Sequence, residues 1–370
     1  MKHPILFCLV GLGLAACTSH QSADSQQNEL TMLVGTYTNG TSHGIYTFRF
    51  SQQTGQAAAL DSLALPNPSF LITSADGKHV YAVSEMNDST AALSALDFDK
   101  QSGRLTLANT LPTQGEDPCH VSTNGKLVLA ANYSGGSLSV FTLKADGSLD
   151  TLAANFRGGT GGPDAERQPV PHVHCSQFSP DGKYAFATDF SADRLLRFPV
   201  SADGRSLQPA DAAFGIEADS GPRHLTFSAD GRHAYLISEL SGKITVFRYT
   251  ADGKLEQQQS IVADKAAARG SADIHLSPDG RFLYASNRLK EDGIAIFAVQ
   301  ADGTLTPAGY QPTGIHPRNF NITPNGKYLL AACRDSNVIQ VYERNAENGL
   351  LTDTHQDIRV DKPVCIQFVP

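Results

Sequence analysis

The sequence predicts an all-β fold, a seven-bladed β-propeller built from four-stranded antiparallel blades. A Gly-centred turn between apolar strands recurs at intervals of 46 to 57 residues, and a second kind of Gly turn recurs between the first ones. Four strands every ~45–50 residues is the period of a propeller blade. Apolar residues alternate with a period of two, which excludes helical solenoids. The absence of tryptophan argues against WD-repeat propellers.

The first kind of turn has the pattern Ser/Thr-x-Asp/Asn-Gly-Lys/Arg. The Asp or Asn side chain hydrogen-bonds its own backbone, and the glycine takes the positive φ that closes a tight turn. Apolar and aromatic runs follow each copy, so each turn is expected to join two strands of a hairpin. The six glycines of this motif are Gly77, Gly125, Gly182, Gly231, Gly280 and Gly326.

The second kind of turn follows a strand that ends in an aromatic or apolar residue. It occurs seven times, one more than the first kind, at Gly55, Gly103, Gly147, Gly204, Gly253, Gly303 and Gly349. The missing first-motif hairpin is expected to form from two separate segments, residues 32–38 and residues 363–368. Strands from both termini would then share one blade and close the ring, which removes the exposed sheet edges that favour aggregation.

The repeat also predicts where functional residues gather. Residues eight before and eight after a first-motif glycine lie at the same end of an antiparallel hairpin. Because the first strand of each hairpin borders the central channel, these side chains should surround one of its mouths. The candidate residues at these positions are His174, Arg223 and Arg318 before the glycine, and Glu85, Glu239, Arg288 and Arg334 after it.

This set of side chains predicts a site for a small anion. Four arginines converge there although the chain carries a net charge of −8, and a concave cationic mouth attracts anionic ligands. A histidine beside a glutamate could transfer protons. Salt bridges between neighbouring blades, such as Arg223 with Glu239, are the alternative interpretation. A functional interpretation is preferred because it is costly to bury several charges without a purpose.

The N-terminus is expected to be an export signal rather than part of the fold. Residues 1–16 form a signal peptide whose apolar stretch is too short to span a bilayer. The sequence Leu14-Ala15-Ala16-Cys17 resembles a lipobox, in which Cys17 becomes the acylated N-terminus; an ordinary signal peptide with an incidental cysteine is the alternative. Residues 17–30 would be a flexible tether to the propeller of residues 31–370. We expect an exported lipoprotein on the periplasmic side of the outer membrane.

Several other features narrow the prediction. The acidic charge argues against a nucleic-acid partner. Four cysteines lie in the folded part and are expected to be single buried thiols. His172 and His174 have a spacing that could bind a metal, but no further ligands are evident, so no metal is assigned. Residues 158–162 are glycine-rich without a nucleotide-binding signature and are expected to form either a mobile rim or lid over the mouth or a plain surface insertion. A short helix is expected at residues 264–269.

Six segments resemble one known family when taken together. They are Val34-Gly35-Thr36-Tyr37-Thr38, Pro171-His172-Val173-His174, Gly221-Pro222-Arg223-His224, Ser238-Glu239-Leu240, Ser286-Asn287-Arg288 and Pro317-Arg318-Asn319-Phe320. In this order they resemble the propeller-type 6-phosphogluconolactonases and the related carboxymuconate lactonizing enzymes. The resemblance covers residues 30–370.

The resemblance implies a lactone hydrolase that opens a small anionic sugar lactone in carbohydrate metabolism, without a cofactor. Its site would combine a histidine, two arginines and a glutamate, which match His174, Arg223, Glu239 and Arg288, with Arg318 as a rival for Arg288. Further substrate contacts would come from His172, His224, Arg318, Arg334 and Glu85. A lactonizing isomerase acting on a muconate-type diacid, and a non-catalytic propeller that binds a sugar acid or a protein, are the alternatives. The expected export departs from the family's cytoplasmic sugar phosphate substrate and leaves the substrate open.

Overall fold

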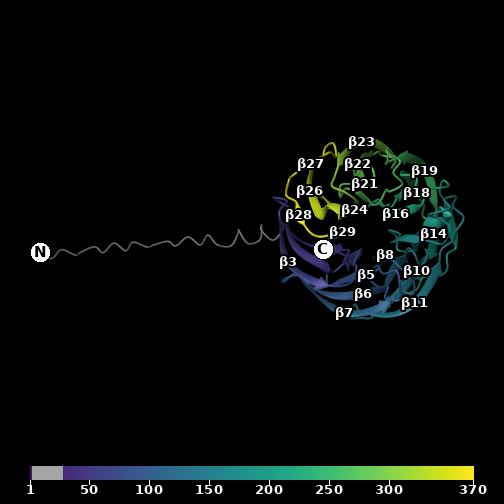
Figure 1. Ribbon diagram of the computed structural model, residues 1–370, viewed down its shortest axis with the longest axis horizontal. Coiled ribbons are helices and arrows are strands. Elements are labelled where there is room, and N and C mark those ends of the chain that lie inside the picture. Colours follow the sequence, from purple (N-terminus) through teal and green to yellow (C-terminus); the bar gives the residue numbers. More distant parts are fainter. Residues whose placement is uncertain (2–27) are drawn as a thin grey trace.

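A computed structural model describes Met1 and residues 28–370 of the chain. Its strands form seven sheets arranged in a ring (Figure 1), and the strands of each sheet pair antiparallel. The predicted propeller is therefore confirmed. The predicted signal peptide, the lipidation site Cys17 and most of the predicted tether lie outside the described residues. Glu29 and Leu30, which the sequence placed in the tether, already belong to the first strand.

Each blade is named here by its strands, from the innermost to the outermost. The first three are blade 1 with β29 (Pro363–Phe368), β1 (Glu29–Thr36), β2 (Gly44–Ser51) and β3 (Ala57–Ala64); blade 2 with β4 (Leu71–Thr73), β5 (His79–Ser84), β6 (Ala92–Asp99) and β7 (Arg104–Pro112); and blade 3 with β8 (Pro118–Thr123), β9 (Leu127–Asn132), β10 (Ser137–Leu143) and β11 (Leu149–Arg157).

The next two blades follow the same plan. They are blade 4 with β12 (Val173–Phe178), β13 (Tyr184–Asp189), β14 (Arg194–Pro199) and β15 (Ala212–Gly215), and blade 5 with β16 (Pro222–Phe227), β17 (His233–Ser238), β18 (Lys243–Tyr249) and β19 (Leu255–Val262). In blade 4 a short 3-10 helix, η1 (Phe190–Ala192), follows β13.

The last two blades complete the ring. They are blade 6 with β20 (Ile274–Leu276), β21 (Phe282–Asn287), β22 (Gly293–Val299) and β23 (Leu305–Pro312), and blade 7 with β24 (Pro317–Ile322), β25 (Tyr328–Cys333), β26 (Val338–Arg344) and β27 (Leu351–Asp353). Blade 7 also holds the 3-10 helix η2 (Arg334–Ser336) and the short strand β28 (Ile358–Arg359), which pairs with β26.

Blade 1 closes the ring with strands from both ends of the chain. The C-terminal strand β29 pairs with β1 and is the innermost strand of that blade, with Val34 opposite Ile366. In Figure 1 the C-terminus lies within the ring, beside the purple strands of the N-terminal segment. This arrangement confirms the predicted closure. With β29 in place, blade 1 has four strands, and the inner edge of β1 is paired rather than exposed.

The predicted turns form because each of them places a glycine at the position that needs a left-handed backbone. All thirteen glycines of the two motifs have positive φ, between 63° and 84°, a region that other residues rarely adopt. In the turn at Gly182, Ser179 donates a hydrogen bond to the Asp181 carboxylate at 2.6 Å, and the same carboxylate accepts the Lys183 amide at 3.1 Å. These contacts are local, which is why the repeat can be recognised in the sequence.

Apolar side chains between the blades form the core. Met32 and Val34 of blade 1, for example, pack with Tyr328 and Leu330 of blade 7. Burying one large apolar side chain stabilises a fold by roughly 1.5–3 kcal/mol. The four cysteines of the described residues, Cys119, Cys175, Cys333 and Cys365, are buried and free, as predicted. Within residues 28–370, no helix has the length and apolar character needed to cross a membrane.

Residues 264–269 do not form the expected helix. The Asp264 carboxylate instead accepts the backbone amides of Ala266 and Ala268, at 3.0 and 2.6 Å. Ala267 and Arg269 both have positive φ, 45° and 59°, which a right-handed helix does not permit. The prediction was wrong because an Asp at the start of a segment also favours a turn closed by its own side chain.

Candidate functional site

Irregular backbone pairing occurs where several inner strands begin. The register between the first and second strands shifts at Cys119, His174, Arg223, Arg318 and Val364, the bulged positions of blades 3, 4, 5, 7 and 1. A β-bulge redirects the side chain that it carries and is common beside functional sites. Four of these residues follow a proline, namely Pro118, Pro222, Pro317 and Pro363. This Pro-x signal marks the same mouth that the turn offset selected.

Glu239 lies at the centre of an arginine cluster at this mouth. Its carboxylate pairs with Arg223 Nε at 2.8 Å, Arg288 Nη2 at 3.2 Å and Arg167 Nη2 at 2.7 Å. Arg223 belongs to the same blade as Glu239, Arg288 comes from blade 6, and Arg167 comes from the segment between blades 3 and 4. Burial would raise the pKa of Glu239, but the three guanidinium groups outweigh it and hold the pKa at about 2.

The buried arginines are held by backbone oxygens as well as by Glu239. Arg223 Nη1 donates to the carbonyl of Ala272 at 2.5 Å, and Arg288 Nε donates to that of Gly270 at 2.7 Å. Burial lowers the pKa of both guanidinium groups, that of Arg288 to about 9. Among the described residues, Arg223 Nη2 makes no hydrogen bond, so this nitrogen can donate to a ligand.

Arg318 differs from its neighbours because it is poorly paired. Its closest carboxylate oxygen is Glu85 Oε2 at 3.6 Å, and its guanidinium lies 5.5 Å from the ring centroid of Tyr37. Within residues 28–370 it makes no hydrogen bond, and Glu85 Oε2 is also buried without one. Tyr37 instead donates to Glu85 Oε1 at 2.8 Å. Arg318 therefore has donors available to a ligand at the mouth.

His174 lies beside these arginines. Its Nδ1 is 3.7 Å from the sulfur of Cys119, and its ring contacts Tyr133 edge to face, with centroids 5.6 Å apart. Burial first, and then the charges of Arg223 and Arg318, lower the pKa of His174 well below its usual value. The imidazole is therefore neutral at pH 7. Its Nε2 makes no hydrogen bond within the described part of the chain.

A second group of charges lies at the rim. Arg334 pairs with Asp335 at 2.7 Å and contacts His316 Nδ1 at 3.2 Å, while His316 Nε2 is 3.1 Å from Arg288 Nη1. A cavity of about 480 Å³ opens here, and its lining includes Tyr37, Glu85, Arg334 and Lys362. The predicted residues His174, Arg223, Glu239, Arg288, Arg318, Arg334 and Glu85 are thus connected at one mouth, which we call the mouth cluster together with Arg167.

His224 lies one residue further along β16, below the mouth cluster. Its Nδ1 is 2.7 Å from an oxygen of Asp273, and its Nε2 faces Arg223 Nη1 at 3.3 Å. One residue from each inner strand segment makes contacts around the channel, and we call these residues the support ring. Five of them follow a bulge, and Phe70 and Asp273 are the corresponding residues of blades 2 and 6: Phe70, His120, Cys175, His224, Asp273, Asn319 and Cys365. A cavity of about 180 Å³ lies among several of them.

His172 lies directly before β12, near the mouth cluster. Its ring stacks on Tyr133 with centroids 4.1 Å apart, and its Nδ1 is 2.7 Å from the Tyr133 carbonyl oxygen. Nδ1 therefore carries a proton that it donates to this oxygen, which leaves Nε2 as its remaining polar atom. In the described chain, no three His, Cys, Asp or Glu side chains are placed to hold a metal ion.

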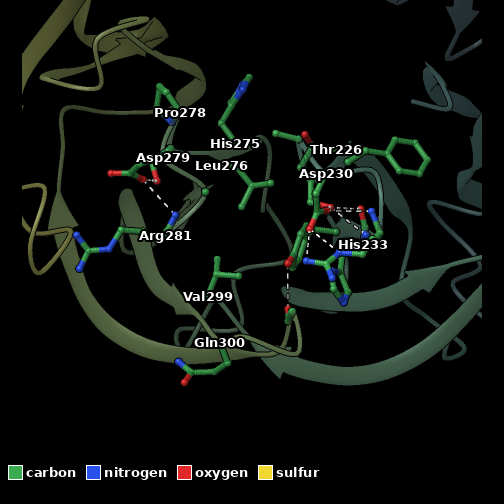
Figure 2. Close-up of a pocket in the computed structure, with 18 of the residues that line it drawn as sticks. Thr226, Asp230, His233, His275, Leu276, Pro278, Asp279, Arg281, Val299 and Gln300 are labelled. Carbon is green, nitrogen blue, oxygen red and sulfur yellow. Dashed lines mark hydrogen bonds and ion pairs between the residues drawn. The ribbon is translucent and has the colours of Figure 1, made fainter. Parts of the chain in front are cut away.

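A larger cavity, of about 620 Å³, lies at the opposite end of the hairpins, between blades 5 and 6 (Figure 2). The turns at Gly231 and Gly280 line it, and their polar groups already bond to one another. Ser277 donates to Asp279 at 2.5 Å, for example, and Asp279 accepts the Arg281 amide at 3.1 Å. Because these contacts recur in other first-motif turns, we do not place the functional site there.

Sequence reasoning missed two residues of this region. Arg167 lies in a segment outside the repeat, so no offset from a turn glycine selects it. Asp273 lies one position after the offset used for Arg223 and Arg318, on a strand whose corresponding residue is Ala272. Asking which carboxylate pairs with His224, the histidine of the Pro-Arg-His segment, would have pointed to Asp273.

Comparison with known proteins assigns the chain to a family. The family described as "Lactonase, 7-bladed beta-propeller" matches residues 31–368. Two 6-phosphogluconolactonases are similar in sequence. The one from Formosa agariphila is 36% identical over 351 residues, 91% of this chain and 99% of that protein. The one from Bacillus subtilis is 35% identical over 346 residues, 91% of this chain and 97% of that protein.

Solved structures give the same assignment. A Bacteroides uniformis protein, described provisionally as a 6-phosphogluconolactonase, is 69% identical, with a TM-score of 0.92 over 93% of this chain and 100% of its own. A periplasmic gluconolactonase from Pseudomonas aeruginosa is 35% identical, with a TM-score of 0.88 over 92% of this chain and 99% of its own. These findings confirm the predicted resemblance. The chain therefore belongs to the lactonase family of seven-bladed β-propellers.

Proposed function

We propose that this chain is a lactonase that hydrolyses a small anionic sugar lactone. The observation that carries the proposal is Arg318, a partly buried guanidinium with no hydrogen bond to any described residue, whose charge acts on neutral His174. A partly desolvated charge whose donors are left unpaired is costly. A ligand that accepts hydrogen bonds would remove this cost, which favours a functional interpretation over a salt bridge alone.

The balance of charge favours an anionic substrate. The mouth cluster holds more cationic than anionic side chains: Arg167, Arg223, Arg288, Arg318 and Arg334 against Glu85, Glu239 and Asp335. A surplus of positive charge in a partly desolvated mouth attracts anions and raises their local concentration. A lactone with a phosphate or carboxylate tail would neutralise part of this surplus.

The available donors suit the chemistry of lactone hydrolysis. Water attacks the carbonyl carbon, a new C–O bond forms, and negative charge develops on the former carbonyl oxygen. Arg318, assisted by Arg223 Nη2, would stabilise that oxygen. His174 Nε2 would take a proton from the water and return it to the ring oxygen as the ring C–O bond breaks. The product is an open-chain hydroxy acid, which releases one proton to the solvent.

Substrate binding would also improve His174 as a base. The charges of Arg223 and Arg318 contribute to the lowered pKa of this histidine. Negative charge that develops on the lactone carbonyl oxygen between these arginines would offset their charge and bring the pKa of His174 closer to neutral. A general base works best when its pKa lies near the operating pH. The free site would thus remain weakly basic until a lactone carbonyl is bound.

The names of the relatives suggest two kinds of sugar lactone. The Formosa and Bacillus proteins are 6-phosphogluconolactonases, and the Pseudomonas protein is a periplasmic gluconolactonase. The cationic mouth favours the phosphorylated substrate, whereas export from the cytoplasm would favour the unphosphorylated one. Both should therefore be assayed, by the release of a proton as each lactone opens.

Arg318→Gln tests the proposed function directly. Loss of a donor to the oxyanion is expected to lower kcat by about 10²–10³, while the protein should remain folded, because no hydrogen bond to a described residue is lost. Arg232→Gln, at an exposed ion pair with Asp230, is the matched control. An active Arg318→Gln protein would contradict the proposal. So would a wild-type protein that binds a sugar acid but opens no lactone.

We also propose that the chain is exported and anchored by lipid at Cys17, on the periplasmic side of the outer membrane. The lipobox-like Leu14-Ala15-Ala16-Cys17 supports this location, and so does the similarity to a periplasmic relative. Cys17→Ser should abolish incorporation of labelled palmitate and release the propeller into the soluble periplasmic fraction. Unchanged membrane association of this variant would contradict the lipid anchor.

A further inference from the structure

Residues 158–172 form an arm that bridges blades 3 and 4 at the mouth of the channel. The arm contains no strand, yet polar contacts hold it in place. The Gly159 amide donates to both oxygens of Asp189 at 3.0 Å, and Gln168 Nε2 donates to Asp193 at 2.9 Å. The arm is therefore a rim held by polar contacts, whereas the glycine-rich sequence predicted either a mobile rim or lid or a plain surface insertion.

A charge pair across the mouth fixes the middle of the arm. Asp164 accepts the backbone amides of Glu166 and Arg167, at 2.8 and 2.9 Å, which closes a turn. Its other oxygen pairs at 2.5 Å with Arg269, from the segment between blades 5 and 6, and Arg269 also pairs with Asp219 at 2.7 Å. The turn at Asp164 thus sets the backbone position of Arg167, and two other blades hold that turn.

Arg167 points from this arm toward Glu239. Its Nη2 donates to Glu239 at 2.7 Å and to the Tyr133 hydroxyl at 3.1 Å, and its guanidinium lies 5.4 Å from the ring centroid of Phe190. Its Nε and Nη1 make no hydrogen bond within the described residues. Because the Tyr133 oxygen accepts from Arg167, the hydroxyl proton of Tyr133 is also available to a ligand.

Exposure separates Arg167 from the other two arginines on Glu239. The side chain of Arg167 is 37% exposed, against 1% for Arg223 and 6% for Arg288. The inner pair faces the channel, while Arg167 reaches solvent at the rim. A charged tail of a substrate would therefore meet Arg167 outside the reacting centre, and the fork of a guanidinium suits a phosphate or a carboxylate.

We propose that Arg167 and Tyr133 form the subsite for the anionic tail of the lactone, so that the arm determines substrate specificity. The proposal rests on the proposed lactonase function. Arg167 does not contact the reacting bond in this arrangement. It selects phosphorylated or carboxylated lactones over neutral ones through binding, and Arg269 acts as a positioning residue through Asp164.

The test compares a phosphorylated aldonolactone with its unphosphorylated counterpart. In Arg167→Gln, KM for the phosphorylated lactone should rise about tenfold or more, with kcat within about twofold, because a charge-assisted contact is lost. KM for the neutral lactone should stay within about twofold of wild type. KM of Arg167→Lys for the phosphorylated lactone should lie between those of wild type and Arg167→Gln, because lysine keeps the charge but lacks the two-pronged guanidinium group.

Two further variants distinguish an effect that acts through the arm from a general effect of removing an arginine. Arg269→Gln should raise KM for the phosphorylated lactone in the same direction but less, and Arg232→Gln should change neither substrate. Equal losses on both lactones in Arg167→Gln, or a loss in kcat alone, would overturn the proposal and show that Arg167 acts only by holding Glu239.

Failure of the proposed function gives a different result. If the wild-type protein opens neither lactone, the subsite is tested by calorimetry with the phosphorylated aldonic acid. A Kd at least about tenfold weaker in Arg167→Gln than in wild type would still support the subsite. Equal affinities in the two proteins would overturn it.

Discussion

Arg223 and Arg318 of the mouth cluster lie one residue before His224 and Asn319 of the support ring on the inner strands β16 and β24, yet the polar groups of the two regions are paired very differently. In the support ring, Asp273 accepts from His224 at 2.7 Å, from His275 at 3.0 Å and from Asn319 at 2.5 Å. In the mouth cluster, Arg318 has no hydrogen bond to a described residue. Fully paired buried groups add rigidity, and unpaired ones are costly unless a ligand completes them.

The comparison shows how a propeller separates stability from function. At the bulges of β16 and β24, Arg223 and Arg318 belong to the mouth cluster, and the next residues, His224 and Asn319, belong to the support ring. The support-ring residue can then hold its neighbour, as His224 holds Arg223 through Nε2 at 3.3 Å. Substitutions in the mouth cluster should therefore affect activity first, and substitutions in the support ring should affect stability first.

Glu239→Gln is expected to have the largest effect, because this mouth-cluster residue should affect both activity and stability. Its carboxylate balances Arg223, Arg288 and Arg167. Removing that charge leaves buried guanidinium groups uncompensated, so the free energy of unfolding should fall by about 3–5 kcal/mol. Lactone opening should be lost as well, because Arg223 would no longer be held. Urea denaturation and a proton-release assay measure the two effects.

An exposed carboxylate provides the control for this variant. Glu217 pairs with Lys243 at 2.6 Å on the surface, and Glu217→Gln should change the free energy of unfolding by less than about 1 kcal/mol. A similarly small change in Glu239→Gln would show that the arginines of the mouth cluster are stabilised by backbone carbonyls and solvent rather than by this carboxylate.

The repeat explains why the ring could be predicted from the sequence and the arm could not. A turn glycine with positive φ and its Asp or Asn are local signals. Because the two strands of the hairpin pair antiparallel, the turn also determines that residues eight positions before and after it, such as Arg223 and Glu239, lie at the same end. The position of Arg167 beside Glu239 depends on the contact between Asp164 and Arg269, and no sequence period relates these residues. The helix expected at 264–269 was wrong for a related reason, since an Asp turn there overrides helix propensity.

The support ring should make stability depend on pH through His224. Burial, and then the charge of Arg223, lower the pKa of His224 from 6.5 to about 4. Between these values the unfolded chain binds more protons than the folded one, so the free energy of unfolding falls as pH falls from 6.5 to about 4. The shift corresponds to about 3 kcal/mol. The stability contributed by neutral His224 is fully present only above pH 6.5.

His224→Gln should reduce this dependence. A glutamine can donate to Asp273 and accept from Arg223 without titrating, so denaturation at pH 6.5 and pH 4 should differ by about 3 kcal/mol less than in wild type. His355→Gln, at an exposed histidine, should leave the difference unchanged. Parallel losses of stability in wild type and His224→Gln would assign the acid sensitivity to other buried histidines, such as His120.

The smallest effect is expected at Cys119, whose sulfur lies 3.7 Å from His174 Nδ1. Burial raises the pKa of this thiol, and only the thiolate is a strong nucleophile. Cys119 therefore contributes packing rather than chemistry. Cys119→Ala should keep kcat within about twofold and lower the free energy of unfolding by about 1 kcal/mol, the scale of a small buried truncation. A loss of activity of 10² or more, with stability retained, would contradict this prediction. It would show that the Cys119 thiol, in contact with His174, takes part in the reaction.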